Sequence, residues 1–227
     1  MKFNLPKSPH KGDLWTSFNK RDFKKINKIM IIIPTTGLKK DFFEAEKRIA
    51  EVKDSSRWIQ VDVCDNVFAP GKTFELELIN KLDFKTDDIL WDVHLMVKEP
   101  IDWIEKCLFI GANRIIGQVE KMSDRELFVR AVKDEGLEVG LAFDIETSVK
   151  NIPEETDEIL LMGRKAGFGE YPLEEKIYKK IKNAKSLNKT VAVDGGANIG
   201  NIEKLKKMGV DIVYSEISYF DLNEKNN

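Results

Sequence analysis

The chain has 227 residues, of which 42% are hydrophobic and 33% are charged. This composition excludes a collagen, a low-complexity chain and a wholly disordered protein, and it predicts a globular core under a highly charged surface. The 37 lysine and arginine residues almost balance the 39 aspartate and glutamate residues, so the net charge is −2. A near-neutral chain offers no electrostatic argument for nucleic-acid binding, and we expect no nucleic acid among its partners.

The cysteines and the apolar runs indicate a cytoplasmic protein. Cys64 and Cys107 lie far apart in apolar segments, so we predict two buried free thiols in a reducing compartment. The longest early apolar run covers residues 29–33, far fewer than the ~20 residues that a membrane span needs. It is also too short and too late for a secretory signal. We therefore expect no membrane partner.

Residues 1–28 differ from the rest of the chain in charge. They carry eight basic and two acidic residues, which gives a net charge of +6. We interpret this segment as a solvated helical leader whose aromatic side chains pack under the first strand, because large aromatic side chains are usually buried. A basic arm that attracts a polyanion is the alternative.

From residue 29 onward, short runs rich in β-branched residues alternate with charged segments. The runs are continuously apolar, which is typical of strands buried on both faces of a parallel sheet. The predicted strands cover residues 29–33, 58–63, 89–96, 113–119, 137–143, 157–162, 189–194 and 210–215.

Five of the intervening segments have apolar residues at helical spacing. The predicted helices cover residues 41–52, 101–109, 127–133, 173–181 and 202–208. Gly111, Gly136 and Gly209 follow three of these helices, at the position where a left-handed residue commonly ends a helix. Ser123, with Glu126 three residues later, predicts a capping box.

Eight strand–helix units in succession predict a closed (β/α)₈ barrel of the TIM type, forming one domain over residues 29–227. An open, doubly wound sheet is the alternative, but no G-x-G-x-x-G motif follows the first strand. In a (β/α)₈ barrel the functional residues gather where the strands end, at the C-terminal mouth.

Asp62, His94 and Asp194 would converge on that mouth. Two carboxylates on either side of one carbon form the pair that a proton shuttle requires: one removes a proton next to a carbonyl, and the other delivers a proton to the opposite face. An imidazole between them would help to hold a divalent cation, which stabilises enediolate oxygens.

Several segments, in their order and spacing, resemble the ribulose-phosphate 3-epimerase family of (β/α)₈ metalloenzymes, which are ribulose-phosphate-binding barrels. The resemblance runs from Ile31 to Phe220 and rests on IIIPTTG, QVDVCDNVFAPGKTF, WDVHLMVKEP, GANRIIGQVE, GLAFDIET, ILLMGRKAGFGE, VAVDGG and DIVYSEISYF. It implies an isomerase of the pentose phosphate pathway that interconverts D-ribulose 5-phosphate and D-xylulose 5-phosphate. It also implies a sugar-phosphate ligand and a homo-oligomer.

The resemblance further implies the residues of the site. The acid/base pair falls on Asp62 and Asp194. The divalent metal (Zn, Fe, Mn or Co) falls on Asp62, His94, Asp194 and Gln60. The substrate-binding positions fall on Thr35, His94, Met96, Gly167, Phe168, Gly169, Gly195, Gly196 and Ser215. In this family backbone N–H groups hold the phosphate.

Some positions depart from the family's pattern. Gln60 stands where the family has a histidine ligand, and an amide oxygen is a weaker and harder ligand, so we expect weaker metal binding, a different metal or no metal. Glu170 and Glu216 stand in the phosphate site, where each would repel a phosphate by about 1 kcal/mol at ~4 Å in water. Arg164 and Lys165 would offset this repulsion by pairing with Glu170 or with the phosphate. Without such an offset, the substrate is not a simple sugar phosphate.

Two other functions remain open. The altered metal and phosphate positions are compatible with a non-catalytic or re-purposed barrel that binds a different small molecule. The orotidine-phosphate decarboxylase and hexulose-phosphate synthase group resembles this architecture, but it needs a D-x-K-x-x-D array after the third strand. Residues 92–97 read DVHLMV, with no lysine between acids.

Overall fold

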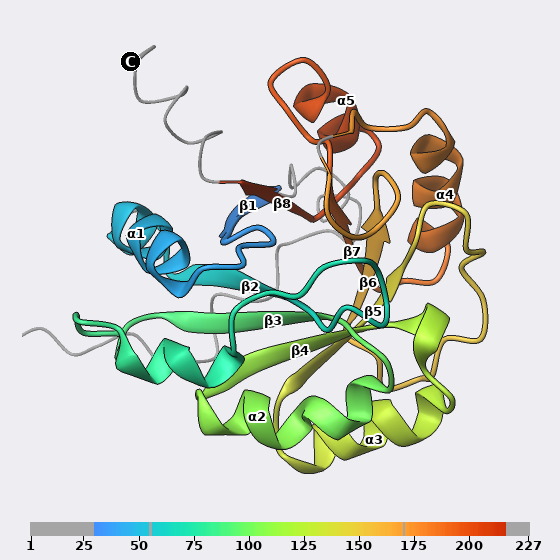
Figure 1. The fold of residues 1–227 in the computed structure, drawn as a ribbon. Helices are drawn as coiled ribbons and strands as arrows, with labels where there is room; N and C mark the ends of the chain where they lie inside the picture. Colours follow the sequence, from blue (N-terminus) through green and yellow to red (C-terminus); the bar gives the residue numbers. More distant parts are fainter. Residues whose placement is uncertain (1–29, 55, 170, 217–227) are drawn as a thin grey trace, which may run out of the picture.

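The computed structural model describes residues 30–54, 56–169 and 171–216. Within them, eight parallel strands close into a barrel in chain order (Figure 1). This closure confirms the predicted TIM-type barrel and excludes the open sheet. The strands are β1 (Ile31–Thr35), β2 (Trp58–Cys64), β3 (Leu90–Met96), β4 (Ala112–Gln118), β5 (Glu138–Phe143), β6 (Glu158–Met162), β7 (Thr190–Asp194) and β8 (Ile212–Glu216).

The five predicted helices are present, with ends that differ from the prediction by up to four residues. They are α1 (Phe42–Val52), α2 (Ile104–Phe109), α3 (Arg125–Asp134), α4 (Lys176–Lys185) and α5 (Ile202–Lys207), and they lie outside the barrel (Figure 1). Short 3₁₀ helices are η2 (Leu76–Lys81), η3 (Pro100–Trp103) and η4 (Val119–Lys121).

The prediction that a helix follows every strand is wrong for two connections of the described chain. The β2–β3 connection has only the 3₁₀ helix η2, and no helix lies between β5 and β6. The β5–β6 connection contains Pro153 and several Ser, Thr and Asn residues, which form helices poorly.

The helix ends follow from local chemistry. At α3 the predicted capping box is wrong: the N-cap is Asp124, whose carboxylate accepts a hydrogen bond from the backbone N–H of Leu127. Ser123 instead donates its hydroxyl to Glu99 at 2.9 Å. Aspartate is as good an N-cap as serine, so the helix begins at Arg125, one residue later than a Ser123 cap would place it and two residues before the predicted range.

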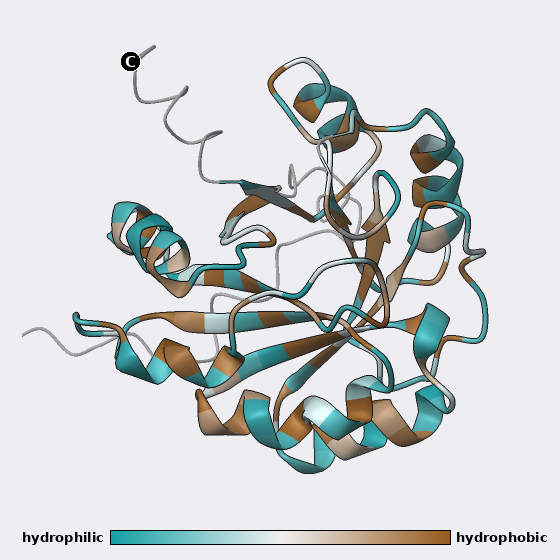
Figure 2. Ribbon diagram, in the orientation of Figure 1, coloured by the Kyte–Doolittle hydropathy of each residue, from teal (hydrophilic) through white to brown (hydrophobic). Residues whose placement is uncertain are grey.

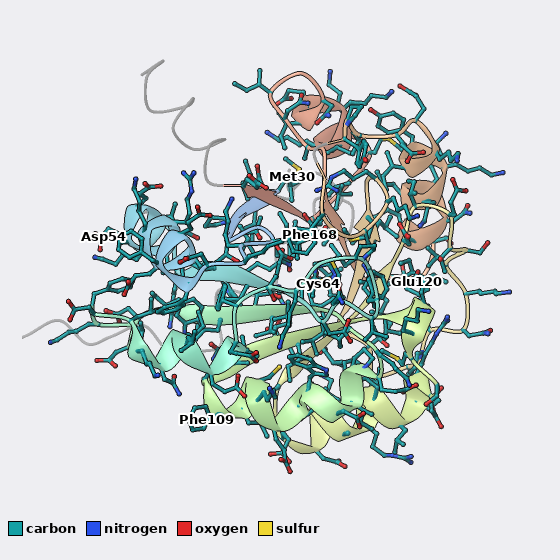
Figure 3. All side chains as sticks on the ribbon, viewed as in Figure 1. Met30, Asp54, Cys64, Phe109, Glu120 and Phe168 are labelled. Atoms are coloured by element: carbon teal, nitrogen blue, oxygen red, sulfur yellow. The ribbon has the colours of Figure 1, made fainter. Side chains whose placement is uncertain are left out.

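Two apolar layers hold the barrel together. The larger layer lies between the strands and the helices, and the smaller layer fills the barrel interior. Figure 2 shows the resulting pattern, with hydrophobic strands and helices that are hydrophilic on their outer faces. Cys107 belongs to the outer layer. Cys64, labelled in Figure 3, belongs to the interior one, and both are buried free thiols, as predicted.

A buried ionic cluster occupies the N-terminal floor of the barrel. Arg114 on β4 lies 2.9 Å from Asp92 on β3 and 3.1 Å from Glu158 on β6, and it donates to the hydroxyl of Tyr214 on β8. Its guanidinium also stacks on Trp58, 4.4 Å from the ring centre. With Glu138 on β5, 2.6 Å from Nη2, the cluster joins side chains of six strands around one cation.

Parts of the sequence interpretation lie outside the described residues. These are the leader over residues 1–28, Glu170 and residues 217–227, so the division into a leader and one barrel domain stays a prediction. Among the helices of the described residues, none has the length and hydropathy of a membrane span.

Candidate active site

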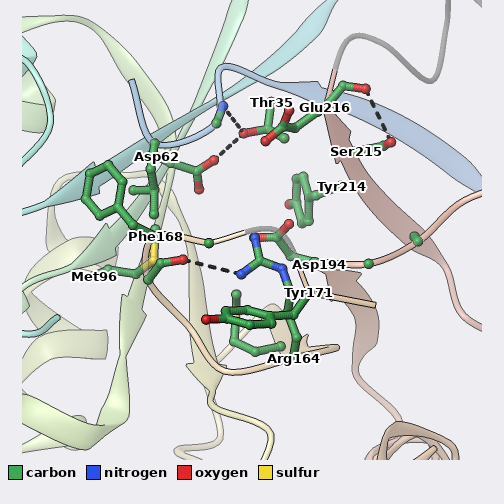
Figure 4. A pocket seen from close by; sticks show the side chains of 18 of the residues that line it. Thr35, Asp62, Met96, Arg164, Phe168, Tyr171, Asp194, Tyr214, Ser215 and Glu216 are labelled. Carbon is green, nitrogen blue, oxygen red and sulfur yellow. Dashed lines mark hydrogen bonds between the residues drawn. The ribbon is translucent and has the colours of Figure 1, made fainter. Parts of the chain in front are cut away.

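A cavity of about 770 Å³ opens at the C-terminal end of the barrel. It lies between the loops that follow β1, β6 and β7 and the ends of β2, β3 and β8 (Figure 4). Asp62 on β2 and Asp194 on β7 both line it, although 132 positions separate them in the sequence. The two carboxylates singled out from the sequence therefore share one pocket.

His94 on β3 lies between the two aspartates. Its Nδ1 is 3.0 Å from Oδ1 of Asp62 and 3.5 Å from Oδ2 of Asp194. The other oxygen of Asp62 accepts a hydrogen bond from the hydroxyl of Thr35, which follows Pro34 at the end of β1 (Figure 4). Both carboxylate oxygens of Asp62 are thus held in place, and this carboxylate cannot rotate freely.

The charges of the cluster influence one another strongly. Burial raises the pKa of Asp194, and the nearby negative charge of Asp62 raises it further. Burial lowers the pKa of His94, but hydrogen bonds to Asp194 and Asp62 and the charges of these two groups outweigh it and raise the pKa to about 10. A positively charged centre between the two carboxylates is therefore the stable arrangement.

A divalent cation fits this cluster. One ligand atom from each of Asp62, His94 and Asp194 can be chosen so that all lie within 4.8 Å of one another. Carboxylate and imidazole ligands suit Mn, Fe, Co and Zn. In addition, Gln60 is fully buried, and neither atom of its amide has a hydrogen-bond partner.

A second buried glutamine, by contrast, has partners for its amide nitrogen. Gln118, also fully buried, can place its amide nitrogen 3.1 Å from the carbonyl oxygen of Ala142 and 2.7 Å from a carboxylate oxygen of Glu120. Buried polar groups almost always have a partner. The unpaired amide of Gln60, on the same face of β2 as Asp62, therefore fits the position of a further ligand to a cation held there.

Glycines form the β6–β7 wall of the pocket. Gly195 and Gly196 have φ angles of +85° and +79°. A side chain on Gly196 would also place its Cβ 2.4 Å from the backbone nitrogen of Leu173. The backbone N–H groups of Gly195 and Gly196 donate to no acceptor in the described part of the chain. They are therefore free to bind a ligand.

Asp144 fixes the position of the loop after β6. Its carboxylate accepts a hydrogen bond from the backbone N–H of Ala166 at 3.0 Å, and its own N–H donates to Glu120. Lys180 on α4 donates to the backbone carbonyls of Phe143 and Asp144. The loop that carries Gly167 and Phe168 is thus anchored to the ends of β4 and β5.

The structure brings the predicted residues together with two qualifications. The predicted positions that line the cavity are Thr35, Asp62, Met96, Gly167, Phe168, Gly169, Asp194, Gly195, Gly196 and Ser215. His94 does not line it, because its ring is buried behind the two carboxylates. The hydroxyl of Ser215 donates to the backbone oxygen of Glu216, so Ser215 presents no free hydroxyl donor.

Sequence reasoning missed four polar side chains of the pocket wall. These are Lys39, Tyr171, Asn198 and Tyr214. Tyr214 was detectable, because it is two residues before Glu216 in a strand and side chains two residues apart share one face. The other three lie on loops, where no periodicity in the sequence indicates which way a side chain points.

The sequence is similar to a known family over most of its length. The model of the ribulose-phosphate 3 epimerase family matches residues 31–220. A ribulose-phosphate 3-epimerase of Buchnera aphidicola is 30% identical over 207 residues, which cover 83% of this chain and 90% of the relative. The enzyme of the same name from Chlamydia pneumoniae is 29% identical over 177 residues, 73% of this chain and 77% of the relative.

Solved structures of other proteins share the fold. Phosphoribosyl anthranilate isomerase from Thermus thermophilus has a TM-score of 0.60 at 13% identity, over 82% of this chain and 87% of that one. A mutant tryptophan synthase α-subunit from Pyrococcus furiosus has a TM-score of 0.58 at 16% identity, over 86% and 90%. At such identities the likeness concerns the barrel alone.

Proposed function

Because the chain belongs to the ribulose-phosphate 3-epimerase family, we propose that it is a metal-assisted epimerase that interconverts D-ribulose 5-phosphate and D-xylulose 5-phosphate. The observation that carries this proposal is the position of Asp62 and Asp194. They reach one pocket from strands that β1 and β8 separate, with the imidazole of His94 between them.

The two aspartates would act as the acid/base pair. Asp62 takes the proton from C3 of the ketose, and the electron pair of the broken C–H bond forms an enediolate. Asp194 then gives its proton to the opposite face of C3, and the two roles are exchanged in the reverse direction. The raised pKa of Asp194 suits the proton donor. Thr35 and His94 orient the carboxylate of Asp62 toward the substrate.

The same residues would bind the cofactor. A divalent cation held by Asp62, His94 and Asp194, with the amide oxygen of Gln60 as a further ligand, would stabilise the negative charge that develops on the substrate oxygens. His94 is fully buried and therefore serves this centre rather than the substrate directly.

Proton exchange tests the proposal directly. The protein is incubated with ribulose 5-phosphate in deuterated solvent, with and without Mn²⁺ or Zn²⁺, and deuterium at C3 is measured by NMR. Asp62→Asn and Asp194→Asn are each expected to lower epimerisation by about 10²- to 10⁴-fold, because each removes one acid/base group. The matched control is Asp87→Asn, which changes an exposed aspartate outside the pocket. Full epimerase activity in either site variant would contradict the proposed roles.

Metal content separates this function from the non-catalytic barrel. A stoichiometric divalent ion in protein purified without chelator supports the epimerase. Protein that holds no metal, even after loading, and shows no exchange at C3 supports a barrel that binds a different small molecule.

A further inference from the structure

Arg164 is a half-buried cation in the pocket, and its positive charge lowers the pKa of the nearby Asp194 without a direct ion pair among the described residues. Its Nη1 donates to the backbone carbonyls of Lys165 and Gly167, both at 3.3 Å. It forms no ion pair with any carboxylate in residues 30–54, 56–169 and 171–216. A guanidinium has five N–H donors, so most of its donors are available to a ligand.

The backbone makes room for this side chain. A Cβ atom on Gly195 would lie 3.0 Å from Cγ and 3.2 Å from Nε of Arg164, so the arginine crosses the space that a side chain at position 195 would occupy. The guanidinium points into the pocket beside Asp194 (Figure 4). Its direction is therefore set by the packing of the β6 and β7 loops.

Two further sets of groups decide where an anion can bind in the pocket. On the β6–β7 side, the unpaired N–H groups of Gly195 and Gly196 accompany Arg164. On the β8–β1 side, a carboxylate oxygen of Glu216 lies 3.0 Å from the position of a Cβ on Gly37, and Glu216 lines the pocket. At ~4 Å, a carboxylate and another anion repel by about 1 kcal/mol in water and by several times more in a drier site.

We propose that Arg164 is a specificity-determining residue that binds the anionic end of the substrate on the β6–β7 side of the pocket, away from Glu216. The identity of that anion as a sugar phosphate rests on the proposed function. The neighbouring cation does not share the role, since Lys165 is exposed and does not line the pocket. Of the two cations that the sequence offered as compensation for the acidic residues, the structure selects Arg164.

Binding of inorganic phosphate tests this role without requiring activity. Isothermal titration of the metal-loaded protein with phosphate, in chloride buffer, compares wild type, Arg164→Gln and Lys165→Gln. Loss of one charge-assisted interaction is expected to weaken phosphate binding by about 10- to 100-fold in Arg164→Gln. Lys165→Gln removes the same charge one residue away and is expected to bind as wild type. Equal affinities of Arg164→Gln and Lys165→Gln, or no phosphate binding by wild type, would overturn the proposal.

Kinetics distinguish anion binding from a purely electrostatic influence on Asp194. In Arg164→Gln, the KM for ribulose 5-phosphate is expected to rise by about 10- to 100-fold, whereas kcat changes far less. The reason is that the contact between Arg164 and the phosphate is equally strong in the bound substrate and in the transition state. A fall in kcat with an unchanged KM would overturn the proposal. Glu216→Gln should tighten phosphate binding.

The test of the Arg164 anion site can be separated from the test of the epimerase activity. Wild type that binds phosphate through Arg164 but exchanges no proton at C3 would refute the epimerase and retain the anion site. Wild type that exchanges the proton while Arg164→Gln binds phosphate normally would refute the anion site alone.

Discussion

Replacing Arg114 by methionine is expected to destabilise the barrel strongly. The variant keeps most of the aliphatic length but removes the only cation that contacts the carboxylates of Asp92 and Glu158 within the described chain, and these are 0% and 1% exposed. Removing one partner of a buried ion pair costs about 3–5 kcal/mol, because the remaining charge has lost its solvent and its partner. Burial raises the pKa of Glu158 to about 8, so at pH 7 this group mostly holds its proton and the loss of Arg114 leaves less uncompensated charge. We therefore expect the lower limit, about 3 kcal/mol.

Urea unfolding followed by far-ultraviolet circular dichroism measures this loss. With a slope of about 3 kcal/mol per molar urea, the midpoint should fall by about 1 M. Arg48→Met is the matched control, because Arg48 is 43% exposed and lies 3.5 Å from Glu51, and exposed pairs contribute about 0–1 kcal/mol. Adding Asp92→Asn to Arg114→Met should restore part of the stability by removing the stranded charge. The reasoning is refuted if Arg114→Met is as stable as Arg48→Met.

Two further predictions concern pH and metal. Glu158 has a pKa of about 8 in the folded protein against 4.5 as its ordinary value, so its contribution to stability is fully present below pH 4.5 and is lost as the pH rises through 8. The free energy of unfolding of wild type relative to Glu158→Gln should thus fall by up to about 1.4 kcal/mol per pH unit within this window, and a flat difference in urea unfolding at pH 5 to 8 would contradict it. Gln60→His replaces an amide oxygen by an imidazole nitrogen and should raise the affinity for Zn²⁺ relative to Mn²⁺ by about tenfold, a difference of 1.4 kcal/mol. Competition with a chromophoric chelator measures both affinities, and an unchanged ratio would show that residue 60 does not contact the metal.

The regular elements were largely predictable because short-range patterns specify them. All eight strands lie within two residues of the predicted ends at each terminus, since a strand buried on both faces must be continuously apolar. The glycines after the helices behave as expected, with φ angles of +74° at Gly111, +75° at Gly136 and +82° at Gly209. The start of α3 was mispredicted because Ser123 and Asp124 are both good N-caps, and contacts with Glu99 decide between them.

The candidate site was predictable where it lies on strands and less so where it lies on loops. Asp62 and Asp194 end or nearly end their strands, so the barrel topology alone brings them to the mouth. Lys39 and Tyr171 also line the pocket, but their direction depends on how each loop packs against its neighbours. Arg164 and Lys165 are adjacent cations in the sequence, and only one of them enters the pocket.

The sequence by itself determined the number and order of the strands, the closed barrel, and the carboxylate and imidazole groups at its mouth, because periodicity and motif spacing act within a few residues of the chain. Only the tertiary structure decided which distant groups meet. Arg114 on β4 contacts Asp92, Glu158 and Tyr214 on three other strands, and Gly195 leaves the space that Arg164 crosses. Such contacts depend on the register of the strands and on the packing of the loops, which bring together residues far apart in the chain and which no local pattern encodes.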